Sequence, residues 1–364
     1  MVPLEIPQAP DHYRADNAGD FSYTPDRMAV FREANRFRRE FGIAAAAADA
    51  RRIDLLLIDV QRDFCHPEGT LYVGGRSGQG AVEDTRRMAE FIYRNLARIT
   101  NIRCTLDSHN NFQIFFPWFW VDSHGEPLSP HTLITVDKRD ASQLINIDPL
   151  GNVLSEDVVP NPAMTSWVTD KGYDWLVEQC RFYNRELAAG GRYTLYLWPP
   201  HCLVGSPGHS VTGVVDEART LHSLARLTQS WTEIKGSHNL TENYSVLRPE
   251  VLTTWDGGVL AERNVRFYKT LVEADALIVA GQAASHCVKS TVQDLLEEIR
   301  REDPSLARKV YLMTDCMSSV VVRGEDGAVA ADFTEAAEQT LDEAASAGMH
   351  LVKSTEPMES WPGM

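Results

Sequence analysis

Short apolar runs alternate with segments of helical spacing from residue 52 onward, and this alternation constrains the fold more than any other feature. The first run, 52–59, has the length of one strand and is apolar enough to be buried on both faces. Strands that alternate with helices predict a parallel sheet covered on both sides. We expect strands at 52–59, 101–106, 193–198, 230–235, 275–281, 309–315 and 349–353, and helices at 81–99, 215–228, 263–273, 286–301 and 329–346.

Two segments depart from this alternation. Residues 24–50 have helical spacing before the first strand, and residues 110–191 separate two neighbouring strands by far more than a usual crossover. The second segment begins with an aromatic burst at 112–122 and ends in a helix expected at 170–188. We therefore expect a partly helical N-terminal extension (1–52), an α/β domain (53–354) with an insertion (110–191), and a C-terminal tail (355–364).

The charge and the cysteines exclude several classes of protein. The net charge of −16 disfavours non-specific nucleic-acid binding and docking on an anionic membrane. No apolar run approaches the ~20 residues that span a bilayer, and the N-terminal residues do not read as a secretion signal. The six cysteines are scattered, unlike a disulfide framework. We expect a cytoplasmic homo-oligomer that acts on a small molecule, without nucleic-acid or membrane partners.

Cys287 is the first candidate for chemistry. It follows the strand expected at 275–281 and lies in the first turn of the helix expected at 286–301. Free N–H groups and the positive end of the helix dipole favour a thiolate there and would lower the thiol pKa. The same N–H groups can hold an oxyanion. The alternative is an inert buried cysteine at a helix start.

Other chemically useful residues also end strands. Asp59 could serve as a general base for a thiol, and Lys235 could stabilise a developing negative charge. Alternatively, Asp59 is a turn residue or a helix cap, and Lys235 is a solvated surface lysine. Because ligands of parallel sheets bind beyond the carboxyl ends of the strands, Asp59, Asp107, Trp198, Lys235 and Gly281 are candidates for one shared site.

One carboxylate and two imidazoles form a possible metal site. Asp107 and His109 follow the second strand as an Asp-x-His pair, and His201 follows the third expected strand. This donor set suits Zn²⁺, with Fe²⁺ or Mn²⁺ as alternatives, and it leaves positions open for water. Alternatively, Asp107 and His109 belong to an ordinary polar loop, and His201 is a capping or packing histidine.

Five blocks of the sequence, in order, resemble the nicotinamidase branch of the isochorismatase-like cysteine hydrolases. They read LLLIDVQRDFCHPEGTLYV, TLDSH, WPPHCLVGSPG, EIKG followed by NYSVL, and VAGQAASHCVKST. The resemblance covers most of 53–354 and implies a three-layer Rossmann-like fold with a six-stranded parallel sheet. Where metal-binding relatives often have a further histidine, four residues after His109, this chain has Gln113.

The resemblance also implies roles for individual residues. It implies a catalytic triad of Asp59, Lys235 and Cys287, metal ligands Asp107, His109 and His201, and an oxyanion hole made by the N–H groups of Ala283 and Cys287. It further implies a cis peptide between Gln282 and Ala283, and substrate contacts by Phe64, Trp198 and Gln61.

The expected activity is that of a metal-containing cysteine amidohydrolase, which cleaves a small amide to acid and ammonia through a thioester. One alternative is a sister hydrolase acting on another small amide, a ureide or a carbamoyl compound. Another is a non-catalytic member whose aromatic insertion binds a partner. We also expect the insertion to narrow the pocket entrance, with Phe112 to Phe116 at the pocket wall.

Overall fold

A computed structural model describes residues 9–190, 193–324 and 327–364. Residues 1–8 of the expected extension and residue 191 of the expected insertion lie outside the described residues. The centre of the molecule is a sheet of six parallel strands in the order β14-β11-β10-β1-β2-β9. Its strands are β1 (Ile53–Ile58), β2 (Asn101–Asp107), β9 (Trp231–Lys235), β10 (Ala276–Gly281), β11 (Val310–Met313) and β14 (His350–Val352). The six-stranded parallel sheet expected from the sequence is confirmed.

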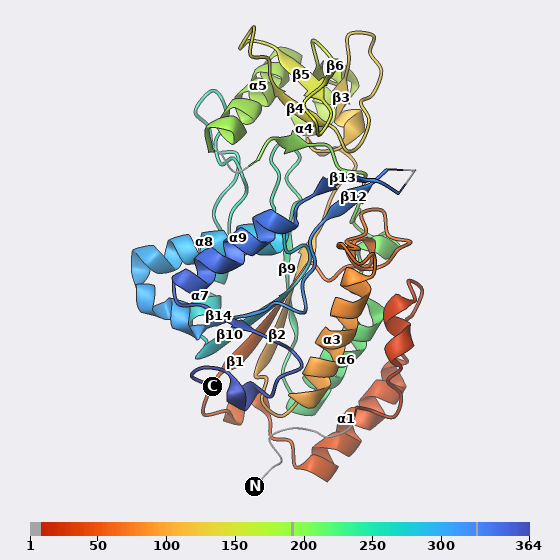
Figure 1. Ribbon diagram of the computed structural model, residues 1–364, viewed down its shortest axis with the longest axis vertical. Helices are drawn as coiled ribbons and strands as arrows, with labels where there is room; N and C mark the ends of the chain where they lie inside the picture. Colours follow the sequence, from red (N-terminus) through yellow and green to blue (C-terminus); the bar gives the residue numbers. More distant parts are fainter. Residues whose placement is uncertain (1–8, 191–192, 325–326) are drawn as a thin grey trace.

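Helices cover both faces of this sheet, which gives the expected three layers (Figure 1). One face carries α3 (Gly80–Arg94) and α6 (Gly213–Arg226), and the other carries α7 (Val265–Val272), α8 (Cys287–Glu302) and α9 (Thr334–Ser346). All six residues of β1 are buried, as expected of a central strand between two neighbours and two helical layers. The short helix α2 (Arg62–Cys65) follows β1.

The start of α9 differs from the prediction. The helix was expected from residue 329, but Val329–Asp332 is strand β13, which pairs antiparallel with β12 (Val321–Arg323). The chain reverses between these strands, with the Gly324 N–H donating to the Ala328 carbonyl at 2.9 Å. Residues whose spacing in the sequence predicted the start of the helix therefore form the second strand of a hairpin.

The N-terminal extension packs on the main domain. Helix α1 (Arg27–Phe41) starts at Asp26, whose carboxylate accepts hydrogen bonds from the Met28 and Ala29 N–H groups. Its buried residues Val30, Ala34 and Phe37 recur at helical spacing, and Figure 1 shows α1 beside α6. The buried Glu217 carboxylate of α6 accepts a hydrogen bond from Tyr23 of the extension and another from Tyr93 of α3.

The insertion forms a lobe beyond the end of the main sheet (Figure 1). A four-stranded antiparallel sheet has the order β6-β5-β4-β8, and a separate pair joins β3 to β7. The lobe comprises β3 (Trp120–Val121), β4 (Leu133–Val136), β5 (Leu144–Ile147), β6 (Val153–Ser155), β7 (Val159–Pro160), α4 (Thr165–Val168), α5 (Tyr173–Gly190) and β8 (Leu195–Tyr196).

The strand expected at 193–198 is therefore misplaced. Only Leu195–Tyr196 is a strand, and it pairs with Leu133 and Ile134 of the insertion instead of joining the main sheet. The position beside β2 in the main sheet is taken by β9, which pairs with β2 from Arg103 to Asp107. Apolarity alone does not say which of two sheets a strand joins.

The remaining ordered turns are short 3₁₀ helices: η1 (Ala15–Gly19), η2 (Ala46–Ala48), η3 (Pro117–Phe119), η4 (Pro162–Met164), η5 (Pro207–His209), η6 (Pro304–Lys309) and η7 (Met358–Ser360). All six cysteines are free and buried. Across the three described stretches of chain, no helix combines the length and apolarity needed to cross a bilayer.

Candidate active site

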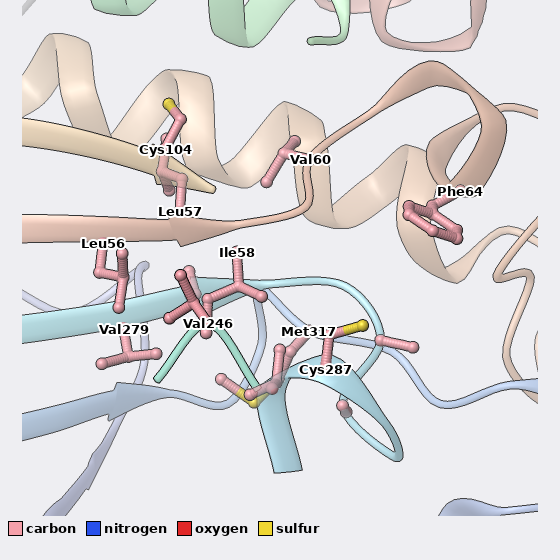
Figure 2. Packing of buried hydrophobic residues seen from close by; sticks show 14 of the residues in the cluster. Leu56, Leu57, Ile58, Val60, Phe64, Cys104, Val246, Val279, Cys287 and Met317 are labelled. Atoms are coloured by element: carbon pink, nitrogen blue, oxygen red, sulfur yellow. The ribbon is translucent and has the colours of Figure 1, made fainter. Parts of the chain in front are cut away.

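Cys287 is the first residue of α8 and is buried directly after the turn that follows β10. Figure 2 shows its side chain at the start of the helix, beyond the strand residues Leu56, Ile58 and Val279. Its Sγ lies 3.6 Å from the Lys235 Nζ. The thiol therefore sits at the carboxyl edge of the sheet beside a buried cation.

Asp59 and Lys235 meet at the same place because β1 and β9 end at the same edge of the parallel sheet. The Lys235 Nζ lies 2.9 Å from an Asp59 carboxylate oxygen and 2.9 Å from an Asp107 carboxylate oxygen. Ligand atoms of Asp59, Asp107 and Cys287 all lie within 4.8 Å of one another. The Thr105 hydroxyl donates to Asp59 Oδ1 at 2.5 Å and fixes the orientation of that carboxylate.

Burial sets the protonation of this cluster. It raises the pKa of the Cys287 thiol well above its usual value, and the nearby Lys235 only partly opposes that effect. The sequence had led us to expect a lowered pKa, because the helix start was considered without the desolvation cost of the thiolate. Burial likewise raises the pKa of Asp59, against the attraction of Lys235. The cluster therefore favours a thiol over a thiolate at rest.

Lys235 stays protonated in this setting. Burial alone would lower the pKa of its ammonium group, but Asp107 and Asp59 raise it well above the usual value. The ammonium group also donates to the Asn243 carbonyl at 3.0 Å. A fixed positive charge therefore lies next to the sulfur, where negative charge would develop.

The loop before Cys287 offers two backbone donors. Within the described part of the chain, the N–H groups of Ala283 and Cys287 have no hydrogen-bond acceptor. The peptide between Gln282 and Ala283 is cis, as expected from the resemblance. Two such free donors next to a buried thiol are suited to hold an oxyanion.

Sequence reasoning missed Asp84, a residue of α3 that supports this loop. Its buried carboxylate accepts hydrogen bonds from the Gln282 side chain at 2.8 Å and the Ser318 hydroxyl at 2.6 Å. The Ser318 carbonyl in turn accepts from the Ala284 N–H at 2.7 Å. An acidic residue within a helix carries no motif, so only the fold connects it to the site.

Asp107, His109 and His201 form a buried cluster whose candidate ligand atoms lie within 4.8 Å of one another. The His109 Nδ1 is 3.0 Å from the Gly236 carbonyl, and the His201 Nδ1 is 2.7 Å from the Pro199 carbonyl. These contacts place the protons on Nδ1 and leave each Nε2 lone pair free. The two Nε2 atoms lie 3.0 and 3.8 Å from the Asp107 Oδ2.

This arrangement fits a divalent metal ion. The buried His109 Nε2 lacks hydrogen-bond geometry to any partner among the residues that the structure describes. Two imidazole nitrogens and a carboxylate oxygen that converge in this way are the donor set of an open metal site. The Gln113 side chain donates to the Gly236 carbonyl at 3.2 Å, which also accepts from His109.

Asp63, also missed from the sequence, holds the loop that carries His201. Its Oδ2 accepts the Cys202 N–H at 2.7 Å, and Oδ1 accepts the Thr70 N–H at 3.1 Å. Cys202 has a positive φ of 49°, a conformation that a non-glycine residue rarely adopts without support. In the sequence, only the closeness of Asp63 to Asp59 could have suggested a role at the site.

A small cavity of about 20 Å³ lies at Cys287, roughly the space for one water molecule. Its walls include Phe64, Asp107, Trp198, His201, Ala283 and Cys287. Phe64 and Trp198, which were expected to contact a substrate, thus line the cavity beside Cys287. Gln61 lies elsewhere: its amide bonds the backbone N–H and carbonyl of Asp107 at 2.7 and 2.8 Å, so it positions Asp107.

The aromatic burst does not form the wall of this cavity. No residue from Phe112 to Phe116 contributes to the lining, so that expectation is wrong. Phe115 and Phe116 are fully buried and pack against the two histidines of the candidate metal site instead. The Phe115 ring centre lies 4.8 Å from that of His109, and the Phe116 ring centre lies 5.9 Å from that of His201.

No family model matches the chain. A nicotinamidase of Escherichia coli (strain K12) is 29% identical over 147 residues, which are 40% of this chain and 56% of that protein. The chain resembles a nicotinamidase. The resemblance expected from the sequence is thereby confirmed, although the match spans little more than half of the length of that relative.

Several solved structures also resemble the chain. The nicotinamidase/pyrazinamidase of Acinetobacter baumanii has 17% identity and a TM-score of 0.46, over 84% of this chain and 98% of that chain. The yeast nicotinamidase bound to the inhibitor nicotinaldehyde has 16% identity and a TM-score of 0.47, over 83% and 99%. The pyrazinamidase of Pyrococcus horikoshii in complex with zinc has 17% identity and a TM-score of 0.41, over 83% and 99%.

Proposed function

We propose that the chain is a metal-dependent cysteine amidohydrolase that converts a small carboxamide to the acid and ammonia. The observation that carries the proposal is the buried Asp59–Lys235–Cys287 cluster beside the free N–H groups of Ala283 and Cys287. The similarity to a nicotinamidase supports a ring carboxamide as the substrate. The same similarity favours catalysis over a purely binding role.

The proposed reaction begins with proton transfer. Asp59 accepts the Cys287 proton as the sulfur attacks the amide carbon, and Lys235 stabilises the negative charge that develops on sulfur. Burial raises the pKa of Asp59, which makes this carboxylate a better proton acceptor, and it also raises the pKa of the Cys287 thiol. The N–H groups of Ala283 and Cys287 hold the oxyanion.

The second half of the reaction returns the groups to their resting state. Asp59 delivers its proton to the amide nitrogen, and the C–N bond breaks. Ammonia departs, and the acyl group remains bound to the Cys287 sulfur as a thioester. A water molecule then loses a proton to Asp59 and attacks the thioester carbonyl. The acid leaves, and the Cys287 sulfur takes the proton back.

Asp107, His109 and His201 would hold the metal ion, and we propose Zn²⁺ from the donor set, with Fe²⁺ or Mn²⁺ as alternatives. When bound, such an ion supplies a Lewis acid that can hold a ring nitrogen of the substrate or a water molecule. Phe64 and Trp198 would pack on the substrate ring. Elemental analysis of protein purified without chelator should find close to one transition metal ion per chain.

A substrate panel tests the proposal. Ammonia release is measured with nicotinamide, pyrazinamide, benzamide, a ureide and a carbamoyl amino acid, each before and after chelator treatment. We expect a ring carboxamide to be turned over fastest and the chelator to slow its turnover. Ammonia release from only the ureide or the carbamoyl compound would show that the chain is a sister hydrolase with another substrate class. Release from none of the compounds would contradict it.

A further inference from the structure

Two stretches of chain come together beside the candidate nucleophile. We call residues 282–286, between β10 and α8, the donor loop, because this loop carries the Ala283 N–H group, a candidate oxyanion donor. Residues 314–320, which connect β11 to β12, form the support segment. The Ala284 N–H donates to the Ser318 carbonyl at 2.7 Å, so the two stretches are joined directly next to the candidate donor.

The Gln282 side chain adds two hydrogen bonds to this junction. Its Nε2 donates to the Asp84 Oδ2 at 2.8 Å, and its Oε1 accepts the Ser318 N–H at 3.2 Å. Because Gln282 is fully buried, its amide depends on these protein groups for hydrogen bonding. Gln282 directly precedes Ala283, so the two bonds hold the peptide unit that carries the candidate donor.

Asp84 of α3 ties both stretches to the opposite helical layer. Its Oδ2 accepts the Gln282 amide and, at 2.6 Å, the Ser318 hydroxyl. Its Oδ1 accepts the Arg87 guanidinium at 2.8 Å, also from α3. The buried carboxylate is therefore held by donors from the donor loop, the support segment and its own helix.

A glycine at the start of α3 allows this close contact. A Cβ added at Gly80 would lie 2.4 Å from the Ser318 Oγ, too close for any real contact. Only a residue without a side chain lets the first turn of α3 approach the support segment in this way. The position of Asp84 is therefore set by the packing of α3 as well as by its hydrogen bonds.

We propose that Gln282, held by Asp84 and Ser318, is a positioning residue that aims the Ala283 N–H group at the oxyanion formed during amide hydrolysis. This inference rests on the proposed function. A donor aimed at a developing charge stabilises the transition state more than the bound substrate. Loss of the positioning should therefore lower kcat and leave KM nearly unchanged.

Gln282→Met tests the inference by kinetics, because it keeps the length of the side chain and removes both of its hydrogen bonds. We expect kcat for nicotinamide to fall at least about tenfold. Ser318→Ala, which removes only the hydroxyl donor to Asp84, should lower kcat less and replaces Gln282→Met should that variant fold poorly. The matched control is Gln293→Met, which removes a half-buried amide of α8 that contacts Thr340.

The control should retain both kinetic constants. A rise in KM with unchanged kcat in Gln282→Met would overturn the inference, since it would assign the residue to substrate binding. Unchanged constants in both Gln282→Met and Ser318→Ala would overturn it as well.

An aldehyde probe separates the oxyanion from the bound substrate. When the Cys287 sulfur adds to the carbonyl carbon of nicotinaldehyde, the thiol proton passes to Asp59 and the carbonyl oxygen becomes an oxyanion. Calorimetry should show at least about tenfold weaker aldehyde binding by Gln282→Met. Nicotinamide should bind Cys287→Ala equally well with and without Gln282→Met. Equal losses for both ligands would overturn the inference.

Hydrogen exchange distinguishes a failure of this inference from a failure of the proposed function. Without ligand, Gln282→Met should speed amide exchange in the donor loop and leave that of β1 unchanged. Unchanged exchange in the donor loop would overturn the inference even if nicotinamide is hydrolysed. Faster exchange in a protein that hydrolyses no amide would contradict the proposed function and still support the role of Gln282 in holding the loop.

Discussion

Lys235 holds together three groups that would otherwise repel one another or remain unpaired in the protein interior. Its ammonium group contacts Asp59 and Asp107 at 2.9 Å each and the Cys287 sulfur at 3.6 Å. The sequence placed Asp59, Asp107 and Lys235 together by a single physical rule, that carboxyl ends of parallel strands meet at one edge, and it singled out Cys287 by its place at a helix start. It could not supply their protonation, because desolvation depends on packing from elements far along the chain.

Replacing Lys235 by methionine should destabilise the metal-free protein. The variant leaves Asp59 and Asp107 as neighbouring buried carboxylates without a cation, and breaking a buried pair in this way costs about 3–5 kcal/mol. Urea unfolding of chelator-treated protein measures the loss. Lys171→Met is the matched control, because Lys171 is half exposed in its pair with Asp256 and its loss should cost at most about 1 kcal/mol. Equal stability of both variants would show that Lys235 does not neutralise the cluster.

At the scale of elements, the strands of the main sheet were predictable and their neighbours in the insertion were not. The sequence of the fully buried strand β1 is a short, mostly apolar run flanked by polar residues, which predicts a buried strand. The run at 193–198 looks similar, yet its two strand residues pair with β4. Pairing partners are set by long-range contacts, which local composition does not contain. Asp63 and Asp84 escaped notice for the same reason, since each acts through a loop distant in sequence.

Asp63→Asn should weaken metal binding. Asp63 accepts the N–H groups of Cys202 and Thr70 with its two carboxylate oxygens, and an amide keeps only one acceptor. The loop that presents His201 would then be less well fixed. Loss of an outer partner of this kind costs about 10–100-fold in metal affinity. Competition with a chromogenic chelator measures the affinity, with Asp122→Asn on the insertion surface as control. An unchanged affinity would assign Asp63 a role in folding alone.

Phe115→Ala should lower stability more than it changes kinetics. The fully buried ring packs on His109 and Phe116, and truncation of a buried phenylalanine costs about 3–5 kcal/mol. The benzamide-to-nicotinamide preference should persist, because Phe115 is absent from the wall of the small cavity at Cys287. Thermal unfolding and steady-state kinetics are compared with those of Phe31→Ala, which removes a partly exposed ring. If Phe115→Ala kept its thermal stability but changed its benzamide-to-nicotinamide preference, Phe115 would instead be part of the substrate pocket.

At the scale of the whole molecule, two parts of the chain meet at the carboxyl edge of the sheet. The main domain supplies Asp59, Lys235 and Cys287, and the long excursion between β2 and α6 supplies His201 and the aromatic backing of both histidines. Figure 1 shows the insertion lobe beyond this same edge. The insertion thus supplies the aromatic packing behind the histidines of the candidate metal site.

The central claim is that Cys287 is the nucleophile of an amide hydrolysis, and ammonia release by Cys287→Ala tests it most directly. Alanine removes the sulfur and keeps a small side chain at the first position of α8, so folding should be unaffected. Cys180→Ala, which removes another buried thiol in the insertion, is the matched control. The account predicts that Cys287→Ala loses all measurable turnover of the best amide, while the control retains it. Turnover by Cys287→Ala above a few per cent of the unmodified enzyme would contradict the account.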